Sequence, residues 1–255
     1  MHKTFKTIEQ VTVNKNEALG TLSKLLDIYI NSGSESEIKK ADLISYWIKD
    51  FAQYIEREDT FDPKKLLRYS RGDVIRANFG FRVGKELGGL HFAVVIEDSN
   101  PQSADVITVV PLSSTNGRSV HHNNVDLGLE VYNKALDQYK KLHAEAVARV
   151  AECKKILSLI SSSEDENEVA EMQAHISSKL KEATELKNIL DKHKNNIGRM
   201  KSGSMAIINQ ITTISKQRIY APKKSTDFLY GVKLSNSALD KINAKLAEKY
   251  IFKKD

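Results

Sequence analysis

The pattern of hydrophobic and polar positions divides the chain into stretches of helical and of strand character. Over the first 60 residues, hydrophobic side chains recur three and four positions apart, as on one face of a helix. The first helical pattern includes the hydrophobic positions from Leu19 to Tyr29 and stops at Asn31. Ser34, followed by Glu37 three positions later, predicts a second helix that starts with a capping box. We therefore expect an N-terminal pair of helices.

Strand character begins near residue 71. Residues 73–79, 91–96 and 105–112 are rich in β-branched residues and predict three strands. The connection between the first two strands is rich in glycine, which permits positive φ or the close approach of a ligand: Gly80, Gly84, Gly88 and Gly89. Short strands joined by such turns are typical of a small, strongly bent sheet or barrel.

A long helical pattern interrupts the strands. Hydrophobic residues recur every three or four positions from Leu136 to Ile160, and every seven positions from Val169 to Ile197. The polar residues 161–167 between them predict a turn, so the two arms form an antiparallel coiled-coil hairpin.

Strand character then returns in residues 204–211 and 214–219, and a final amphipathic helix begins near Ser235. The hairpin is therefore inserted into a β domain, and the fold class is α+β. We expect an N-terminal helical region at residues 1–65. A barrel follows in two segments, residues 66–129 and 199–255, the second of which includes the C-terminal helix. The inserted hairpin occupies residues 130–198.

Composition narrows the class of protein. The single Cys153 excludes a disulfide scaffold and a multi-cysteine zinc site. No secretory signal and no apolar run of membrane-spanning length are present, so we expect a cytoplasmic protein without membrane contact. The net charge of +6 and the pI near 9.1 suit an anionic partner, although lysine is abundant on many ordinary surfaces.

Several segments, taken in order, resemble the MazF/PemK family of endoribonuclease toxins. The first half of the family is matched by Arg71-Gly72-Asp73-Val74, by the run from Gly84 to Ile96 and by Val109-Val110-Pro111-Leu112-Ser113-Ser114. Its second half is matched by residues 203–219, which contain Gln-Ile-x-Thr-Ile-x-Lys-x-Arg, and its closing helix by residues 234–242. The resemblance covers residues 68–128 and 200–250.

This resemblance implies an SH3-like barrel, interrupted here by the hairpin. It also implies the toxin of a type II toxin–antitoxin system that cleaves single-stranded RNA by attack of the 2′-hydroxyl, without metal or other cofactor. The partners it implies are single-stranded RNA and a cognate antitoxin protein, and it suggests a homodimer. Such cleavage requires a group that moves protons, donors for the charged phosphorane and a surface that holds the strand.

His91 stands where the family usually has an arginine. An arginine stays protonated, whereas a histidine titrates near pH 6.5 and can act as acid or base. We interpret His91 as the first catalytic candidate; the alternatives are RNA binding alone or an ordinary histidine at the start of a strand.

The second position that the family resemblance singles out is a serine or threonine at the end of the third strand. Ser113 occupies it and can donate to a phosphate oxygen, with Ser114 beside it as a candidate RNA contact. A Ser-Ser pair that simply marks a turn is the alternative. Glu86 matches an acidic position in the first loop of the family, where it could orient a ribose or a basic neighbour or could simply be solvated.

Arg118 is the third catalytic candidate, since it or His121 could supply the positive charge that the family arginine would have given. His121 and His122 are expected on a strand, where adjacent side chains point to opposite faces. A solvated turn is the alternative for this segment. Arg82 and Lys85 in the glycine-rich loop are candidate phosphate contacts or ordinary surface residues.

The remaining RNA-binding candidates lie in the second half of the family pattern. Gln210 and Arg218 match that pattern, although Arg218 could only brace the fold, and Thr212 stands where an arginine is frequent. The competing function is a catalytically inactive MazF-like protein that binds nucleic acid or protein through its coiled-coil arm. A DNA clamp is a third function, and the mixed Lys and Glu of the hairpin argue against it.

Overall fold

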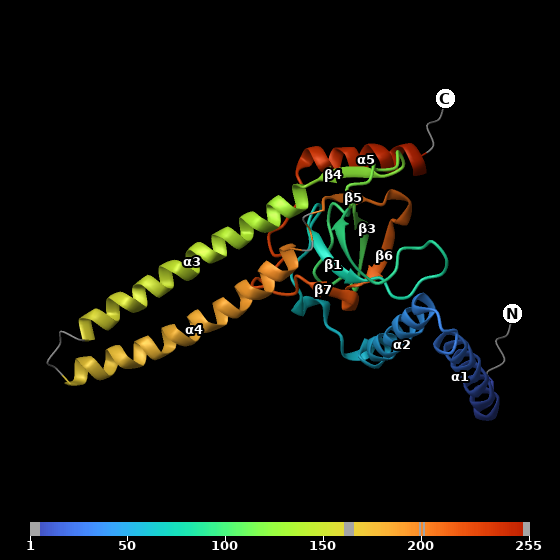
Figure 1. Ribbon diagram of the computed structural model, residues 1–255, viewed down its shortest axis with the longest axis horizontal. Coiled ribbons are helices and arrows are strands. Elements are labelled where there is room, and N and C mark those ends of the chain that lie inside the picture. Colours follow the sequence, from blue (N-terminus) through green and yellow to red (C-terminus); the bar gives the residue numbers. More distant parts are fainter. Residues whose placement is uncertain (1–5, 161–165, 199, 201, 252–255) are drawn as a thin grey trace. The chain divides into compact units, whose positions relative to one another are not determined.

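The computed structural model describes residues 6–160, 166–198, 200 and 202–251. It divides into two compact units, one ending at Asp59 and one beginning at Thr60. Figure 1 labels their helices and strands. Each unit is described separately below.

The first unit consists of two packed helices, α1 (Ile8–Ile30) and α2 (Glu35–Glu56). The capping box occurs at α1, where the Thr7 side chain and the Gln10 side chain each bond the backbone N–H of the other. At α2 the expected capping box is wrong. Ser34 is the N-cap residue, but its hydroxyl bonds that of Ser36 at 2.9 Å and caps no backbone N–H.

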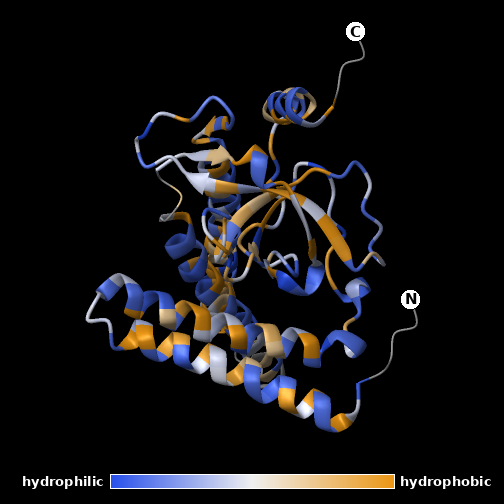
Figure 2. Ribbon diagram, turned by 90° about the vertical axis from the view of Figure 1, so that its right-hand side faces the viewer, coloured by the Kyte–Doolittle hydropathy of each residue, from blue (hydrophilic) through white to orange (hydrophobic). Residues whose placement is uncertain are grey.

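Little of this unit is buried. No residue of α1 is buried, and α2 buries only Ala41 and Ile44. In Figure 2, hydrophobic and hydrophilic positions alternate along both ribbons, as expected of amphipathic helices.

The second unit contains an antiparallel sheet, which confirms the α+β class. Its strands follow the order β4-β5-β3-β2-β1-β7, and β6 also pairs with β3. Closure of this sheet into a barrel remains a prediction. The strands are β1 (Val74–Asn78), β2 (Leu90–Val95), β3 (Val106–Ser114), β4 (Val125–Gly128), β5 (Ser204–Ala206), β6 (Thr212–Ser215) and β7 (Ile219–Ala221).

Two predicted strands are each shorter than expected because a 3-10 turn interrupts them. Residues 204–211 form β5 and then the turn η3 (Ile208–Gln210), and residues 214–219 are divided by η4 (Lys216–Arg218). Lys216 fixes the second turn: its buried ammonium donates to the carbonyl of Pro101 at 2.9 Å, and its backbone N–H donates to Asp105. Further 3-10 turns are η1 (Glu58–Thr60) and η2 (Pro63–Lys65).

Hydrophobic clusters cover both faces of the sheet. The larger cluster includes the inward residues of α5 (Asn236–Tyr250), the predicted C-terminal helix, whose N-cap is Ser235 as expected. The smaller cluster packs on the other face, and its buried members are Tyr69, Ile75, Ala77, Phe79, Ala93, Val95, Ile107, Val109, Ile214 and Ile219. Burial of these side chains supplies the main stabilising contribution to the unit.

Two long helices project from the sheet between β4 and β5: α3 (Glu130–Ile160) and α4 (Glu166–Gly198). They lie antiparallel and side by side (Figure 1), and ion pairs join Arg149 to Glu182 at 3.1 Å and Lys179 to Glu152 at 3.4 Å. The predicted turn at 161–167 falls mostly outside the described residues, and coiled-coil packing of the arms remains a prediction.

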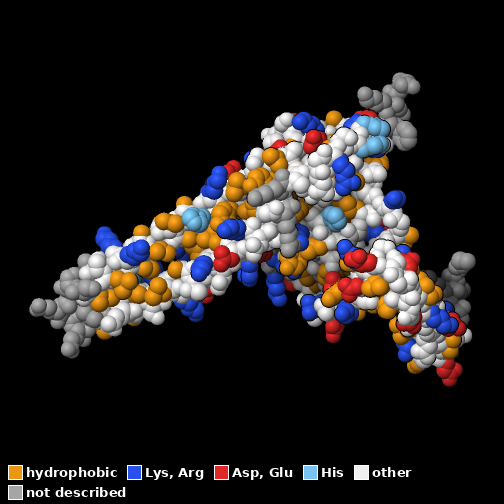
Figure 3. All heavy atoms as spheres, in the orientation of Figure 1, with side chains coloured by type: hydrophobic (Ala, Val, Ile, Leu, Met, Phe, Trp, Pro, Cys, Tyr) orange, Lys and Arg blue, Asp and Glu red, His pale blue; other side chains and the backbone are white. Residues whose placement is uncertain are grey.

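The root of this hairpin is part of the larger core. Val131 and Ala135 of α3 and Ile197 of α4 are buried in the larger cluster, and the Glu130 carboxylate accepts hydrogen bonds from the N–H and hydroxyl of Ser235. Farther out, hydrophobic side chains follow both helices between scattered Lys and Arg (Figure 3). Among the described helices, none is both long enough and apolar enough to cross a bilayer.

Candidate functional site

The start of β2 and the end of β3 bring His91 and Ser113 to the same face of the sheet. The register pairs Ala93 with Pro111 and Phe92 with Leu112, so one further step places His91 opposite Ser113. Directly opposed residues of antiparallel strands point to the same side. Both side chains are half-buried. Continued by one residue, this register puts the imidazole and the hydroxyl on the same face of the sheet, at the edge of the smaller hydrophobic cluster.

The surroundings of His91 favour its neutral form. Burial is the main cause that lowers the pKa of the imidazole below its ordinary value of 6.5, and the positive charge of Arg76 acts in the same direction. Backbone hydrogen bonds with Leu112 and Gly88 act in the opposite direction and are outweighed. At pH 7 the ring is therefore mainly neutral and able to accept a proton.

The glycine-rich loop, residues 80–89, is closed at its base beside His91. The Gly89 N–H donates to the Gly80 carbonyl at 2.7 Å, and the Phe79 N–H donates to Gly89 at 2.8 Å. A Cβ atom on Gly88 would lie 2.6 Å from the Gly80 carbonyl oxygen. Gly88 is thus required by close approach of two backbone segments, since any side chain there would collide with an immobile atom.

Gln210 holds this loop against the sheet. Its side-chain oxygen accepts from the Leu87 N–H at 3.3 Å, and its amide nitrogen donates to the Lys85 carbonyl at 3.5 Å. Both ends of the amide are therefore used within the protein, which makes Gln210 a positioning residue for the loop.

Arg82, Lys85 and Glu86 lie on that loop. Arg82 donates from Nε to the Phe79 carbonyl at 2.9 Å, and its guanidinium stands 3.9 Å from the Glu86 carboxylate. This pair, with Arg82 half-buried and Glu86 exposed, contributes little to stability. Lys85 is exposed, so the loop presents two cations near the His91 side of the sheet.

Other residues singled out from the sequence occupy different positions. Ser114 is exposed and follows Ser113 on β3, so the two hydroxyls point to opposite faces. Thr212 opens β6 opposite Val109. Arg218 donates from Nε to the Asn78 carbonyl at 2.7 Å, a contact that braces η4 against β1.

Arg118 and His121 lie in the loop between β3 and β4. Arg118 is exposed and its N–H closes a turn onto Thr115 at 3.0 Å. The expected placement of His121 and His122 on a strand, facing opposite sides, is wrong: both lie before β4 begins, and their ring centroids are 4.2 Å apart. The short turn at residues 121–124 directs both rings to one side.

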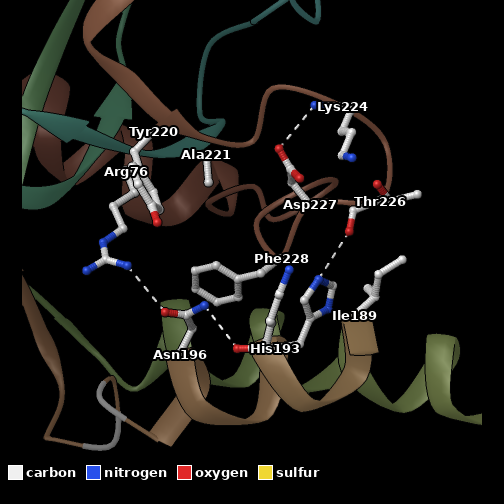
Figure 4. A pocket seen from close by; sticks show the side chains of 11 residues that line it. Arg76, Ile189, His193, Asn196, Tyr220, Ala221, Lys224, Thr226, Asp227 and Phe228 are labelled. Carbon is white, nitrogen blue, oxygen red and sulfur yellow. Dashed lines mark hydrogen bonds between the residues drawn. The ribbon is translucent and has the colours of Figure 1, made fainter. Parts of the chain in front are cut away.

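No recorded contact among the described residues joins Arg118 or His121 to His91. The positive charge that does act on His91 belongs to Arg76 on β1, which sequence reasoning missed. The available signal was a single arginine within an otherwise apolar strand, Val-Ile-Arg-Ala-Asn. Arg76 also lines a pocket at the root of α4, shown in Figure 4 and considered below.

The described parts of the chain contain no group of three or more His, Cys, Asp or Glu side chains placed to hold a metal ion. The candidate site consists of His91, Ser113 and the glycine-rich loop with Arg82 and Lys85.

Comparison with known proteins finds one family that part of the chain resembles. Residues 70–160 match the profile of the family described as the PemK-like, MazF-like toxin of type II toxin–antitoxin systems. The match runs from β1 through β4 and α3, and it confirms the MazF/PemK resemblance of this segment. No curated protein matches the chain. For residues 200–250 the family resemblance remains a prediction, although β5, β6 and β7 pair with strands of the matched segment.

Proposed function

We propose that this protein is the toxin of a type II toxin–antitoxin system and that it cleaves single-stranded RNA. The family match over residues 70–160 supports the toxin class. The observation that carries the chemistry is the placement of His91 opposite Ser113, with an imidazole that burial keeps neutral. A cognate antitoxin protein is the partner that would silence the activity, and a homodimer is the expected assembly.

In the proposed reaction, neutral His91 accepts the proton of a ribose 2′-hydroxyl. The 2′ oxygen then attacks the adjacent phosphorus, a P–O2′ bond forms and the P–O5′ bond breaks. The 5′ oxygen takes a proton from solvent and leaves as a hydroxyl, while the other product ends in a 2′,3′-cyclic phosphate. No oxidation or reduction occurs, so the protein has only to move protons and stabilise charge.

Ser113 and the loop supply that stabilisation. The Ser113 hydroxyl donates to a nonbridging phosphate oxygen, whose negative charge grows in the phosphorane. Arg82 and Lys85 attract the RNA backbone to the same side, and Gln210 with Gly88 keeps their loop in place.

The test is cleavage of a single-stranded RNA by the purified full-length protein in the presence of a chelator. We expect products with 2′,3′-cyclic phosphate and 5′-hydroxyl ends. His91→Ala should reduce the rate by at least about 100-fold, because a positioned general base contributes roughly 10²–10⁴. Ser113→Ala should reduce it by about tenfold or more, as expected for loss of one donor to developing charge.

The matched control is His175→Ala, which removes an exposed histidine of α4 and should leave the rate unchanged. Full activity of folded His91→Ala would refute the catalytic role of this residue. Absence of cleavage by the wild-type protein on a panel of RNA sequences would instead favour a catalytically inactive binding protein.

A further inference from the structure

A pocket of about 450 Å³ lies on the second unit where α4 meets the sheet. Three segments line it: β1 with β7, the last turns of α4, and the loop that follows β7. Figure 4 shows Arg76 and Tyr220 on one side, Ile189, His193 and Asn196 from α4 below, and Thr226, Asp227 and Phe228 from the loop. Its volume falls within the range of small-molecule sites.

The charge of the pocket is positive. Arg76, Lys192 and Lys224 line it against a single carboxylate, that of Asp227. Asp227 already accepts hydrogen bonds from the backbone N–H groups of Lys223 and Lys224, at 2.6 and 3.2 Å. In the described part of the chain neither Lys192 nor Lys224 has an ion-pair partner, so two ammonium groups remain available to an anion.

Two aromatic rings lie beside Arg76. The Arg76 guanidinium lies between the rings of Phe92 and Tyr220, at 5.8 and 5.4 Å from their centroids. Tyr220 is 61% exposed, so much of its surface is accessible to a further planar group. Phe228 is buried and forms the floor, edge-on to the His193 ring at 6.0 Å.

The walls are held by polar contacts that fix their shape. Arg76 donates to the Asn196 side chain at 3.3 Å, and His193 bonds the Thr226 carbonyl through Nε2 at 3.2 Å. These contacts join α4 to β1 and to the loop after β7. The pocket is therefore formed before a ligand arrives, which reduces the entropic cost of binding.

We propose that this pocket binds a nucleoside phosphate, with its base stacked on Tyr220 and its phosphate held by Lys192 and Lys224. A nucleotide can bind such a surface in two ways: its base stacks on an aromatic ring, and lysine side chains neutralise its phosphate. A free nucleotide and one nucleotide of a single-stranded RNA present the same chemistry. The proposal does not rest on cleavage at His91.

The experiment measures binding to the full-length protein by calorimetry with adenosine monophosphate, and by fluorescence anisotropy with a short labelled RNA. The RNA carries 2′-O-methyl groups, which remove the attacking hydroxyl and keep it intact. We expect the double variant K192A/K224A and the variant Tyr220→Ala each to weaken binding by about tenfold or more. Adenosine without phosphate should bind less tightly and should be insensitive to K192A/K224A.

The matched control K181A/K187A removes two exposed lysines from the same helix, and its affinities should equal those of the wild type. Pocket-dependent binding of the mononucleotide assigns the site to free nucleotides, and pocket-dependent binding of the RNA alone assigns it to an RNA strand; both support the proposal. Failure of both probes to bind, or binding that the pocket variants leave unchanged, overturns it. Because the readout is affinity, these results are separate from the outcome of the cleavage assay.

Discussion

At the scale of single residues, His91 differs from a surface histidine in two respects. It is half-buried, and its protonated form is opposed by the charge of Arg76. Both effects lower its pKa, whereas the arginine usual in the family would stay charged at every working pH. A histidine at this position therefore makes the chemistry of the site depend on pH.

We predict an acid limb in the pH dependence of kcat/KM, with a midpoint below 6.5. Activity falls on the acid side because the neutral imidazole is the base. The rate is therefore full above the pKa of His91 in the folded protein and is lost as the pH falls through that pKa. Arg76→Gln removes the repulsion of the protonated form and should move the midpoint upward.

An NMR titration of the His91 ring protons, assigned with His91→Ala, measures the same pKa without requiring activity. A midpoint at or above 6.5 in the wild-type protein would contradict the buried, neutral histidine.

Sequence reasoning singled out His91 and Ser113 because both stand at positions of a local family pattern, and their catalytic roles remain predictions. It could not identify Arg76, His193 or Tyr220 as neighbours, since they come from β1, α4 and β7, and only the folded chain brings them together. Local sequence suggested Gln210 as an RNA contact, which remains a prediction, but it did not show that the amide of Gln210 bonds the backbone of the glycine-rich loop.

At the scale of elements, the strands β2 and β3 and the helix α5 follow the predicted pattern closely, because their hydrophobic residues are local and continuous. The turns η3 and η4 were missed because tertiary contacts impose them. Buried Lys216 is the clearest example. Its ammonium donates to carbonyls of a distant loop, and the pattern of hydrophobic positions in the sequence does not predict this contact.

The glycine loop is the element on which the site most depends, and Gly88→Ala tests it. The added Cβ would lie 2.6 Å from the Gly80 carbonyl oxygen, so the loop must open and the hydrogen bonds of Gln210 must lengthen. We expect a loss of stability of about 1–3 kcal/mol, as for other overpacked sites, and a reduced cleavage rate. Thermal unfolding and the RNA assay measure the two effects.

Gly84→Asn is the control in the same loop. Gly84 has a positive φ of 63° with open space around it, and asparagine tolerates that backbone conformation. Stability and rate should stay near those of the wild type. A Gly88→Ala protein with unchanged stability and activity would show that the loop does not need the close contact.

At the scale of the whole molecule, the inserted hairpin consists of an outer arm and a root that is part of the core. Val131, Ala135 and Ile197 are buried with residues of the sheet and of α5. The ion pairs Arg149–Glu182 and Glu152–Lys179 fix the register of the two arms, and in this register residue 142 faces residue 189. The arm can therefore be shortened at matched positions.

Removal of residues 143–188 with a short Gly-Ser bridge should leave the second unit folded, with a melting temperature close to that of the full chain. Removal of residues 135–194 also takes away Ala135 from the core and His193 from its bond to Thr226. That deletion should lower the melting temperature by on the order of 5 °C or more, at about 2–4 °C per kcal/mol.

Circular dichroism during heating compares the two deletions with the full chain. Unfolding of the shorter deletion at room temperature would show that the outer arm is required for folding. Equal melting temperatures for both deletions would show that Ala135 and the His193 contact contribute nothing to stability.

Gly128 and Ser204 pair across β4 and β5, at the points where the hairpin leaves the sheet and returns to it. Both ends of the hairpin are thus fixed by a backbone ladder of the sheet. Each helical turn added to both arms moves the tip outward by about 5.4 Å and shifts no strand. The reach of this projection can therefore be redesigned as a spacer of chosen length on an unchanged scaffold.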